Sequence, residues 1–242
     1  MQERGFLLVA DISGYTEFVR LHNLRKKSAV GAFAANIYES HAEAIVSDLL
    51  EAVIEAIEPT MKLNKLEGDA AFFHVDETAN EHQADDIYAA MERAQAAFQK
   101  KANALVFVQA CGCEPCMQSK NLRLKIVVHH GDYLLKTIRQ FEEIAGETVI
   151  FVHRMLKNNI NSNEYWLVSE EFSQKLSAEN AAMFSKVTED IDGFGKTDLD
   201  CLILSTPDPE NDTIKSRSWM RNWFRQLGYF VSAPLKRGVA RK

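Results

Sequence analysis

The sequence predicts an α+β fold with a ferredoxin-like β-α-β-β-α-β core and extra strands at its C-terminal end. Three observations support this fold class. An apolar strand opens the chain, a hairpin signal lies between two helical stretches, and a strand of alternating apolar residues follows the second helix. For a core of this topology we expect the helices to cover one face of the sheet.

The first strand is expected at Phe6–Ala10, five consecutive apolar residues typical of a strand covered on both faces. It ends at Asp11. A carboxylate in that position is either a turn or capping residue or a metal ligand. A short helix is expected from Tyr15 to about Leu24, and a long amphipathic helix over Ser28–Ile57, stopped by Pro59.

A β-hairpin is expected next, with strands at Met61–Glu67 and Ala70–Val75 joined by Gly68 and Asp69. In a ferredoxin-like sheet this hairpin lies beside the first strand. We therefore expect Asp69, at the hairpin tip, to approach Asp11 and to supply a second carboxylate.

Lys65 is the most informative single residue of this hairpin. By strict alternation it shares a face with the apolar residues Met61 and Leu63. A charge on such a face needs a partner, which is an ion pair, an interface or a ligand.

The later elements follow from apolar periodicity and from glycine positions. We expect a helix over Ala84–Lys101 or on to Ala110, a strand over Leu122–His130 ended by Gly131, its hairpin partner over Tyr133–Arg139, a helix from about Gly146 to Lys157, and strands over Glu164–Val168 and Leu199–Leu204 with a small helix between them.

The composition is that of a globular protein, with 46% hydrophobic and 26% charged residues. A net charge of −6 argues against nucleic acid as the main partner. Asp11 interrupts the only early apolar run, so no signal peptide is expected, and no stretch approaches the roughly 18 apolar residues of a membrane helix. We therefore expect a cytoplasmic protein.

The C-terminal segment differs in character from the rest. From Thr213 to Lys242 it holds eight Lys or Arg residues and no Asp or Glu. We expect a main domain over residues 1–210 and a basic, aromatic extension over 211–242, formed by a helix and a tail. Residues 216–242 could contact an anionic membrane surface, but a helix that packs its aromatic side chains on the main domain is favoured.

Three of the four cysteines, Cys111, Cys113 and Cys116, lie within six residues. Three close thiolates could bind Zn²⁺ with a fourth ligand from elsewhere. Buried or redox-active thiols are an equally good interpretation.

Five segments, in order, resemble the class III adenylyl and guanylyl cyclases and cover about residues 5–205. "LLVADISGYTEF" resembles the first metal-binding strand and turn, and "KLEGDAAFF" the hairpin that follows. "VVHHGDYLL" resembles the next strand, "IAGETVIFVHRM" the helix with transition-state residues, and "GKTDLDCLIL" the last strand with its lysine. The details indicate a divergent bacterial branch.

The resemblance implies that Asp11 and Asp69, with the main-chain carbonyl of Ile12, hold Mg²⁺ or Mn²⁺. Oxygen ligands suit these ions, and divalent cations offset the charge of reacting phosphates. The amides of Ser13, Gly14, Tyr15 and Thr16, at a helix start, would cradle the β- and γ-phosphates.

The family reads the purine base at positions matched here by Lys65 and Glu143. Lysine at the first position accompanies use of ATP, although adenylyl enzymes usually have Asp or Thr where this chain has Glu143. Arg154 matches the arginine that stabilises the α-phosphate, and Lys196 matches the triphosphate-binding lysine. Ile150 replaces the family asparagine, and loss of one such contact typically costs on the order of 10²–10³ in rate.

The expected function is therefore conversion of ATP to cyclic AMP and pyrophosphate at a homodimer interface. The family takes the metal ligands from one subunit and the base-reading and arginine residues from its partner, so a two-fold dimer would hold two sites. The alternatives are a catalytically silent nucleotide-binding or scaffolding module, which Ile150 favours, and a domain that only dimerises, with its tail docking at a membrane.

Overall fold

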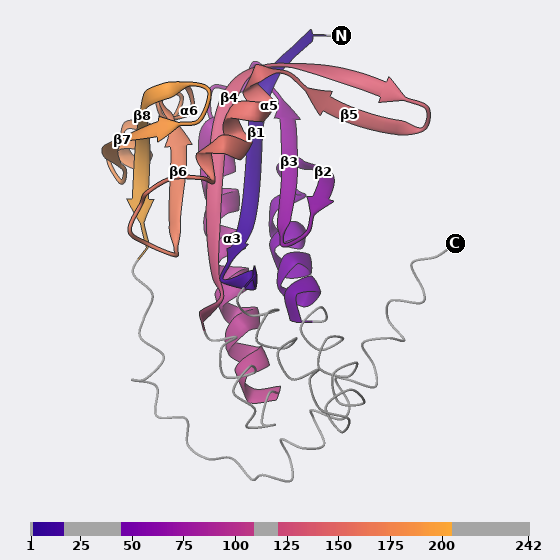
Figure 1. Cartoon of the computed structure of the whole chain (residues 1–242), viewed down its shortest axis with the longest axis vertical. Coiled ribbons are helices and arrows are strands. Elements are labelled where there is room, and N and C mark those ends of the chain that lie inside the picture. The colour runs from indigo at the N-terminus through magenta and orange to yellow at the C-terminus, as the bar shows by residue number, and fades with distance from the viewer. Residues whose placement is uncertain (1, 17–44, 109–120, 205–242) are drawn as a thin grey trace. The chain divides into compact units, whose positions relative to one another are not determined.

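The computed structural model describes residues 2–16, 45–108 and 121–204. Its sheet has the strand order β2-β3-β1-β4-β6-β8-β7, with β5 paired to β4 (Figure 1). The strands are β1 (Gln2–Ser13), β2 (Lys62–Glu67), β3 (Ala70–Asp76), β4 (Arg123–Ile138), β5 (Phe141–Ala145), β6 (Tyr165–Ser169), β7 (Ser185–Ile191) and β8 (Gly195–Ile203). The helices are α3 (Gln83–Val108), α5 (Glu147–Met155), α6 (Glu170–Ser173) and α7 (Ala178–Ala181), and residues 45–57 are also helical.

The order β4-β1-β3-β2 within this sheet is that of a ferredoxin-like core, so the predicted α+β fold is confirmed. β1 is the central strand of this core and pairs antiparallel with both β3 and β4. β6 joins β4 in parallel, and β8 and β7 extend the sheet in antiparallel fashion. The extra C-terminal strands therefore continue the same sheet.

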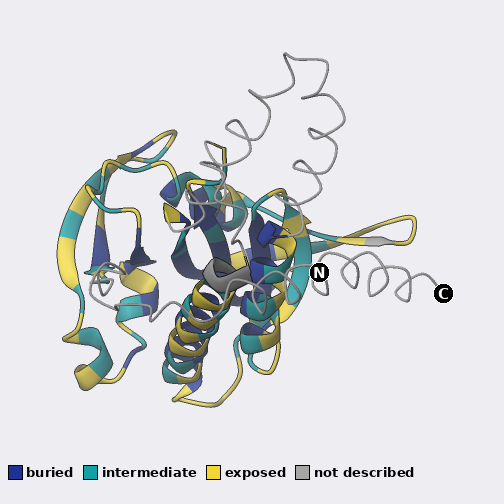
Figure 2. Ribbon diagram, turned by 90° about the horizontal axis from the view of Figure 1, so that it is seen from below, coloured by how far each residue is buried: buried dark blue, intermediate teal, exposed yellow. Residues whose placement is uncertain are grey.

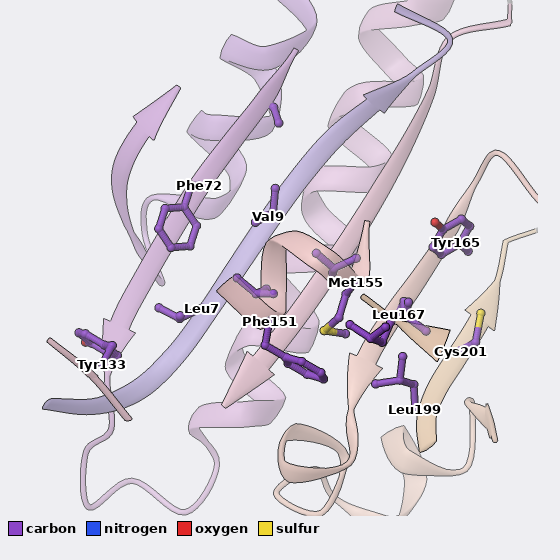
Figure 3. Packing of buried hydrophobic residues seen from close by; sticks show 14 of the residues in the cluster. Leu7, Val9, Phe72, Tyr133, Phe151, Met155, Tyr165, Leu167, Leu199 and Cys201 are labelled. Atoms are coloured by element: carbon purple, nitrogen blue, oxygen red, sulfur yellow. The ribbon is translucent and has the colours of Figure 1, made fainter. Parts of the chain in front are cut away.

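One face of the sheet is covered by α5. Leu7 and Val9 of β1 belong to a buried cluster with Phe151 and Met155 of α5 and Leu167 of β6 (Figure 3). This face also carries the charged residues discussed below, because strand residues two apart point to the same side.

The first turns of α3 pack on the opposite face. The ring of Tyr88 in α3 contacts Trp166 of β6 edge-to-face at a centroid distance of 5.4 Å, and Trp166 points away from its neighbour Leu167. The expectation that the helices cover one face is therefore wrong. The run Phe6–Ala10 puts apolar side chains on both faces of the sheet, so helices must cover both faces to bury them.

The prediction that Gly131 ends a strand is wrong, because this residue lies inside β4. A Cβ at this position would lie 2.9 Å from Thr148 Oγ1 of α5, so the glycine allows close helix–strand packing. β4 therefore runs on to Ile138, and its hairpin partner is β5 rather than Tyr133–Arg139. The end of β4 and β5 project as an arm, which Figure 2 shows to be mainly exposed.

The predicted small helix between the last strands is present as α6 and α7. The strand β7 that follows them was not predicted. Only Ile191 of its seven residues is buried, so the strand gives a weak apolar signal. β8 begins at Gly195, earlier than the predicted Leu199.

Several predictions fall outside the described residues. They concern most of the helix expected over residues 15–24, residues 28–44 of the long helix, the cysteines Cys111, Cys113 and Cys116, and the extension over residues 211–242. Among the helices that the structure describes, none is long and apolar enough to cross a membrane.

Candidate functional site

The ends of β1 and of the β2–β3 hairpin bring Asp11 and Asp69 together. Asp11 lies opposite Ala70 in the register of β1 and β3, directly beside the hairpin turn. The amide of Ile12 donates a hydrogen bond of 3.1 Å to the main-chain carbonyl of Asp69. The two carboxylates therefore belong to adjacent strand ends, as the sequence predicted.

The electrostatics of this pair are unfavourable in the absence of a cation. Burial and, to a smaller extent, the charge of Asp69 raise the pKa of Asp11 to about 6, against the opposing effect of Lys125. Burial also raises the pKa of Asp69. Groups with perturbed pKa values cluster at functional sites, so this pair of partly buried acids is a candidate site.

The pair fits a hard divalent cation. Carboxylate oxygens are the ligands that Mg²⁺ and Mn²⁺ prefer, and a bound cation would offset both the burial of Asp11 and its repulsion from Asp69, which raise its pKa. Within residues 2–16, 45–108 and 121–204, no three His, Cys, Asp or Glu side chains are grouped to hold a metal ion. The protein would thus supply two carboxylates and a main-chain oxygen such as that of Ile12.

Lys65 points to the α5 face because of a β-bulge in β2. Leu63 pairs with Phe73 and Lys65 pairs with Phe72, so Asn64 is an extra residue. Lys65 therefore lies on the opposite face from Leu63, and the expectation that they share a face is wrong. Strict alternation fails because the bulge reverses the side-chain direction at this point.

The ammonium group of Lys65 has the partners that its position requires. Its Nζ lies 3.0 Å from Glu67 Oε1 and 3.8 Å from Glu143 Oε2, and 5.9 Å from the ring centre of Phe72. The structure thus brings together Lys65 and Glu143, the two residues expected to read a base. Lys65 also lowers the pKa of Glu67, against the effect of burial, with His153 acting in the same direction.

α5 carries the next group of candidate residues. Ile150 is 55% exposed, and Arg154, one turn later, forms an ion pair with Asp192 in the β7–β8 turn. Lys196 lies just beyond this turn, exposed at the start of β8 and opposite Asp190. Phe194 anchors the turn to α5 through an aromatic contact with Phe151 at 4.9 Å.

The segment expected to cradle phosphates begins at the end of β1. Ser13 is 6% exposed, and its Oγ has no hydrogen-bond partner among the described residues. Gly14 has a φ of 87°, a left-handed conformation that suits glycine, and Tyr15 and Thr16 are helical. This is the strand–turn–helix junction that the sequence predicted.

Four further residues lie at the site and were not predicted. Lys125 is the cross-strand neighbour of Asp11, and its charge in the half-buried strand segment "RLKIVV" was the available signal. Glu67, His153 and Asp192 gave no signal, because their roles depend on how α5 lies over the hairpin and the β7–β8 turn.

The sequence has a similar counterpart in Mycobacterium tuberculosis. The "Uncharacterized protein Rv2561/Rv2562" is 34% identical over 163 residues, which cover 67% of this chain and 75% of that protein. The family described as "Protein of unknown function (DUF2652)" matches residues 46–165. That segment includes the β2–β3 hairpin and all of α5.

Solved structures share the fold at low sequence identity. The adenylyl cyclase CyaB from P. aeruginosa has a TM-score of 0.60 at 12% identity, with 86% of this chain and 96% of that chain covered. The guanylate cyclase domain of RhGC from Catenaria anguillulae, solved with GTP, has a TM-score of 0.54 at 13% identity, with 85% and 100% covered. A class III adenylyl cyclase-like ATP-binding protein from Pseudomonas aeruginosa has a TM-score of 0.53 at 16% identity, with 76% and 37% covered.

Proposed function

Since the chain belongs to the protein family of Rv2561/Rv2562 and has the fold of class III adenylyl and guanylyl cyclase domains, we propose that it is a metal-dependent nucleotidyl cyclase. Its substrate would be ATP, and its products cyclic AMP and pyrophosphate. The solved relatives of this fold include an adenylyl cyclase and a guanylate cyclase domain bound to GTP, which supports a purine triphosphate as the ligand class.

The observation that carries the proposal is the pair Asp11 and Asp69 at adjacent strand ends, where burial and mutual repulsion raise the pKa of Asp11 to about 6. A purely structural acid pair in this position would only destabilise the fold. With Mg²⁺ or Mn²⁺ bound, the same pair would bring positive charge to a triphosphate and acidify the ribose hydroxyl.

The reaction would be an intramolecular displacement. The bond from the ribose 3′-oxygen to the α-phosphorus forms while the bond from that phosphorus to the β-phosphate oxygen breaks. Pyrophosphate leaves, and the hydroxyl proton passes to solvent. Arg154 would contact the α-phosphate, Lys196 the departing phosphates, and the amides of residues 13–16 the β- and γ-phosphates.

We propose that the site is completed in a homodimer. Asp11 and Asp69 would come from one subunit, and Lys65, Glu143 and Arg154 from the other, as the family resemblance implies. The exposed apolar side chain of Ile150, which lies on the same helix face as Arg154, is consistent with cover by a second copy.

The test is a turnover assay on the purified chain with Mn²⁺ and each of ATP, GTP, CTP and UTP, with cyclic product and pyrophosphate as readouts. We expect cyclic AMP from the wild type and none from Asp11→Ala. Absence of any cyclic product with all four nucleotides would contradict the enzymatic proposal.

A catalytically silent nucleotide-binding module is the second candidate, and Ile150 favours it. An isoleucine cannot donate the hydrogen bond that the family asparagine gives to the ribose. One solved relative is itself described as an adenylyl cyclase-like ATP-binding protein. Nucleotide binding that depends on Asp11, without turnover, would support this candidate.

A further inference from the structure

The side chains of Glu67 on β2 and His153 on α5 connect Lys65, the residue proposed to read the base, to helix α5. Glu67 lies between Lys65 and His153, with Oε1 3.0 Å from Lys65 Nζ and Oε2 2.9 Å from His153 Nε2. Each oxygen of this one carboxylate therefore has its own partner. Lys65 and Glu67 stand two residues apart on β2 and share the face under α5.

His153 is held firmly in place. Its Nδ1 lies 2.7 Å from the carbonyl oxygen of Val149, one turn earlier in α5, and its ring packs on Phe72 at a centroid distance of 4.9 Å. Both ring nitrogens face acceptors, so an imidazole that carries a proton on each nitrogen makes both hydrogen bonds. The position of Glu67 is thereby fixed relative to the helix.

We propose that Glu67, held by His153, is a positioning residue that fixes Lys65 and so determines which purine base the site prefers. This inference rests on the proposed nucleotide site. It assigns a role to two residues that make no contact with the base themselves.

The chemistry of the purine edge explains why the position of Lys65 matters. Adenine presents a donor, the 6-amino group, beside the acceptor N1, whereas guanine presents the acceptor O6 beside the donor N1–H. Lys65 can only donate, and an ionised Glu143 can only accept. The two groups together therefore match either base, but in opposite order along its edge.

Base preference consequently depends on which of the two groups lies at purine position 6. A free lysine side chain is flexible and could serve both orders. Glu67 restrains it at 3.0 Å, while Glu143 is further away at 3.8 Å. Without Glu67 the ammonium group could move around Glu143, and discrimination would weaken.

The experiment measures the dissociation constants of the Mn²⁺ complexes of 3′-deoxy-ATP and 3′-deoxy-GTP by calorimetry on the full chain. These analogues lack the attacking hydroxyl and cannot be cyclised. The quantity compared is the ratio of the two constants, because a general loss of affinity cancels in it.

We expect Glu67→Gln to move this ratio about fivefold or more toward unity, which corresponds to about 1 kcal/mol. His153→Phe keeps the ring on Phe72 but removes both nitrogens, and it should shift the ratio in the same direction. The double variant should shift it no further than Glu67→Gln alone, since both residues act through one contact.

The matched control is Glu142→Gln. It removes the ion pair of 3.0 Å between Lys62 Nζ and Glu142, which also joins β2 to β5 but lies outside the Lys65 group. Its ratio should equal that of the wild type.

The inference is overturned if the wild type binds both analogues equally, or if both affinities fall together in Glu67→Gln with the ratio unchanged. Should Glu67→Gln fail to fold, an unchanged ratio in His153→Phe has the same meaning. A wild type that binds neither analogue overturns the proposed function itself, and the inference with it.

Discussion

Asp11 stands opposite Ala70 in the register of β1 and β3, which puts it beside Asp69. Burial and the charge of Asp69 together raise the pKa of Asp11 to about 6. The fold therefore maintains two partly buried acids side by side at a cost in stability. Such a cost is common at functional sites and is recovered when a ligand binds.

Removal of one acid should stabilise the metal-free protein. The pKa of Asp11 is raised from its ordinary value of 3.8 to about 6 in the folded state, so the free energy of unfolding falls as the pH rises from about 4 to 6 and the loss is complete above about 6. We expect Asp11→Asn to raise that free energy by about 2 kcal/mol at pH 7.5. Thermal melting in EDTA measures it. Asp198→Asn, on an exposed carboxylate of β8, should give no such gain.

Divalent cations should stabilise the wild type but not Asp11→Asn. Mn²⁺ at millimolar concentration should raise the melting temperature of the wild type by several degrees, because a ligand that binds only the folded state stabilises it. The same concentration should leave Asp11→Asn unchanged. An equal shift of the melting temperature in both proteins would mean that the cation binds at a site that does not include Asp11.

Cation binding should weaken as Asp11 takes up a proton. Because the pKa of Asp11 is raised to about 6, the proton competes with the cation below that pH. The Mn²⁺ dissociation constant should be nearly constant above pH 7 and rise about tenfold per unit below pH 6. Titrations followed by electron paramagnetic resonance between pH 5 and 8 measure this. A flat profile over that range would contradict a role for Asp11.

Ile150→Asn should increase turnover. Ile150 is 55% exposed, so an asparagine there costs little packing, and it supplies the amide that the resemblance to class III cyclases implies at this position. We expect a rise of at least about tenfold in the rate of cyclic AMP formation, since one such donor is worth on the order of 10²–10³. Ile203→Asn, at a similarly exposed isoleucine, is the control. Equal rates of cyclic AMP formation in the wild type and in Ile150→Asn would contradict a role for this position in turnover.

Asp192 should compete with the nucleotide for Arg154. The guanidinium group is paired with the Asp192 carboxylate, which is 75% exposed, so the pair is weak and can exchange for a phosphate. Asp192→Asn should raise the affinity for Mn²⁺–3′-deoxy-ATP about two- to fivefold at low salt. The gain should vanish when Arg154→Ala is added to the same chain. A gain in affinity that persists in the double variant would mean that Asp192 does not act through Arg154.

The arrangement of the pair could be predicted because it depends on topology alone. The buried run Phe6–Ala10, the hairpin around Gly68 and the helix after it identify a ferredoxin-like core, and that core puts Asp69 beside Asp11. The turn at Gly14, directly after β1, could be predicted in the same way, because a glycine there suits the positive φ of 87°.

The contacts around Lys65 could not be predicted, for a physical reason. A single bulge residue, Asn64, reverses the direction of the side chains that follow it. Glu67 and His153 come together only because α5 lies across the hairpin, and that position depends on side-chain packing. Gly131 was misread for the same reason, because its importance lies in the approach of Thr148 and not in the local chain.

The central claim is that Asp11 and Asp69 form a cation-dependent nucleotide site. Calorimetric titration of the full chain with 3′-deoxy-ATP, in Mn²⁺ and in EDTA, tests it most directly. We predict binding by the wild type in Mn²⁺ only, and no binding by Asp11→Asn or Asp69→Asn under either condition. Binding of equal strength in EDTA, or by either variant in Mn²⁺, would contradict it.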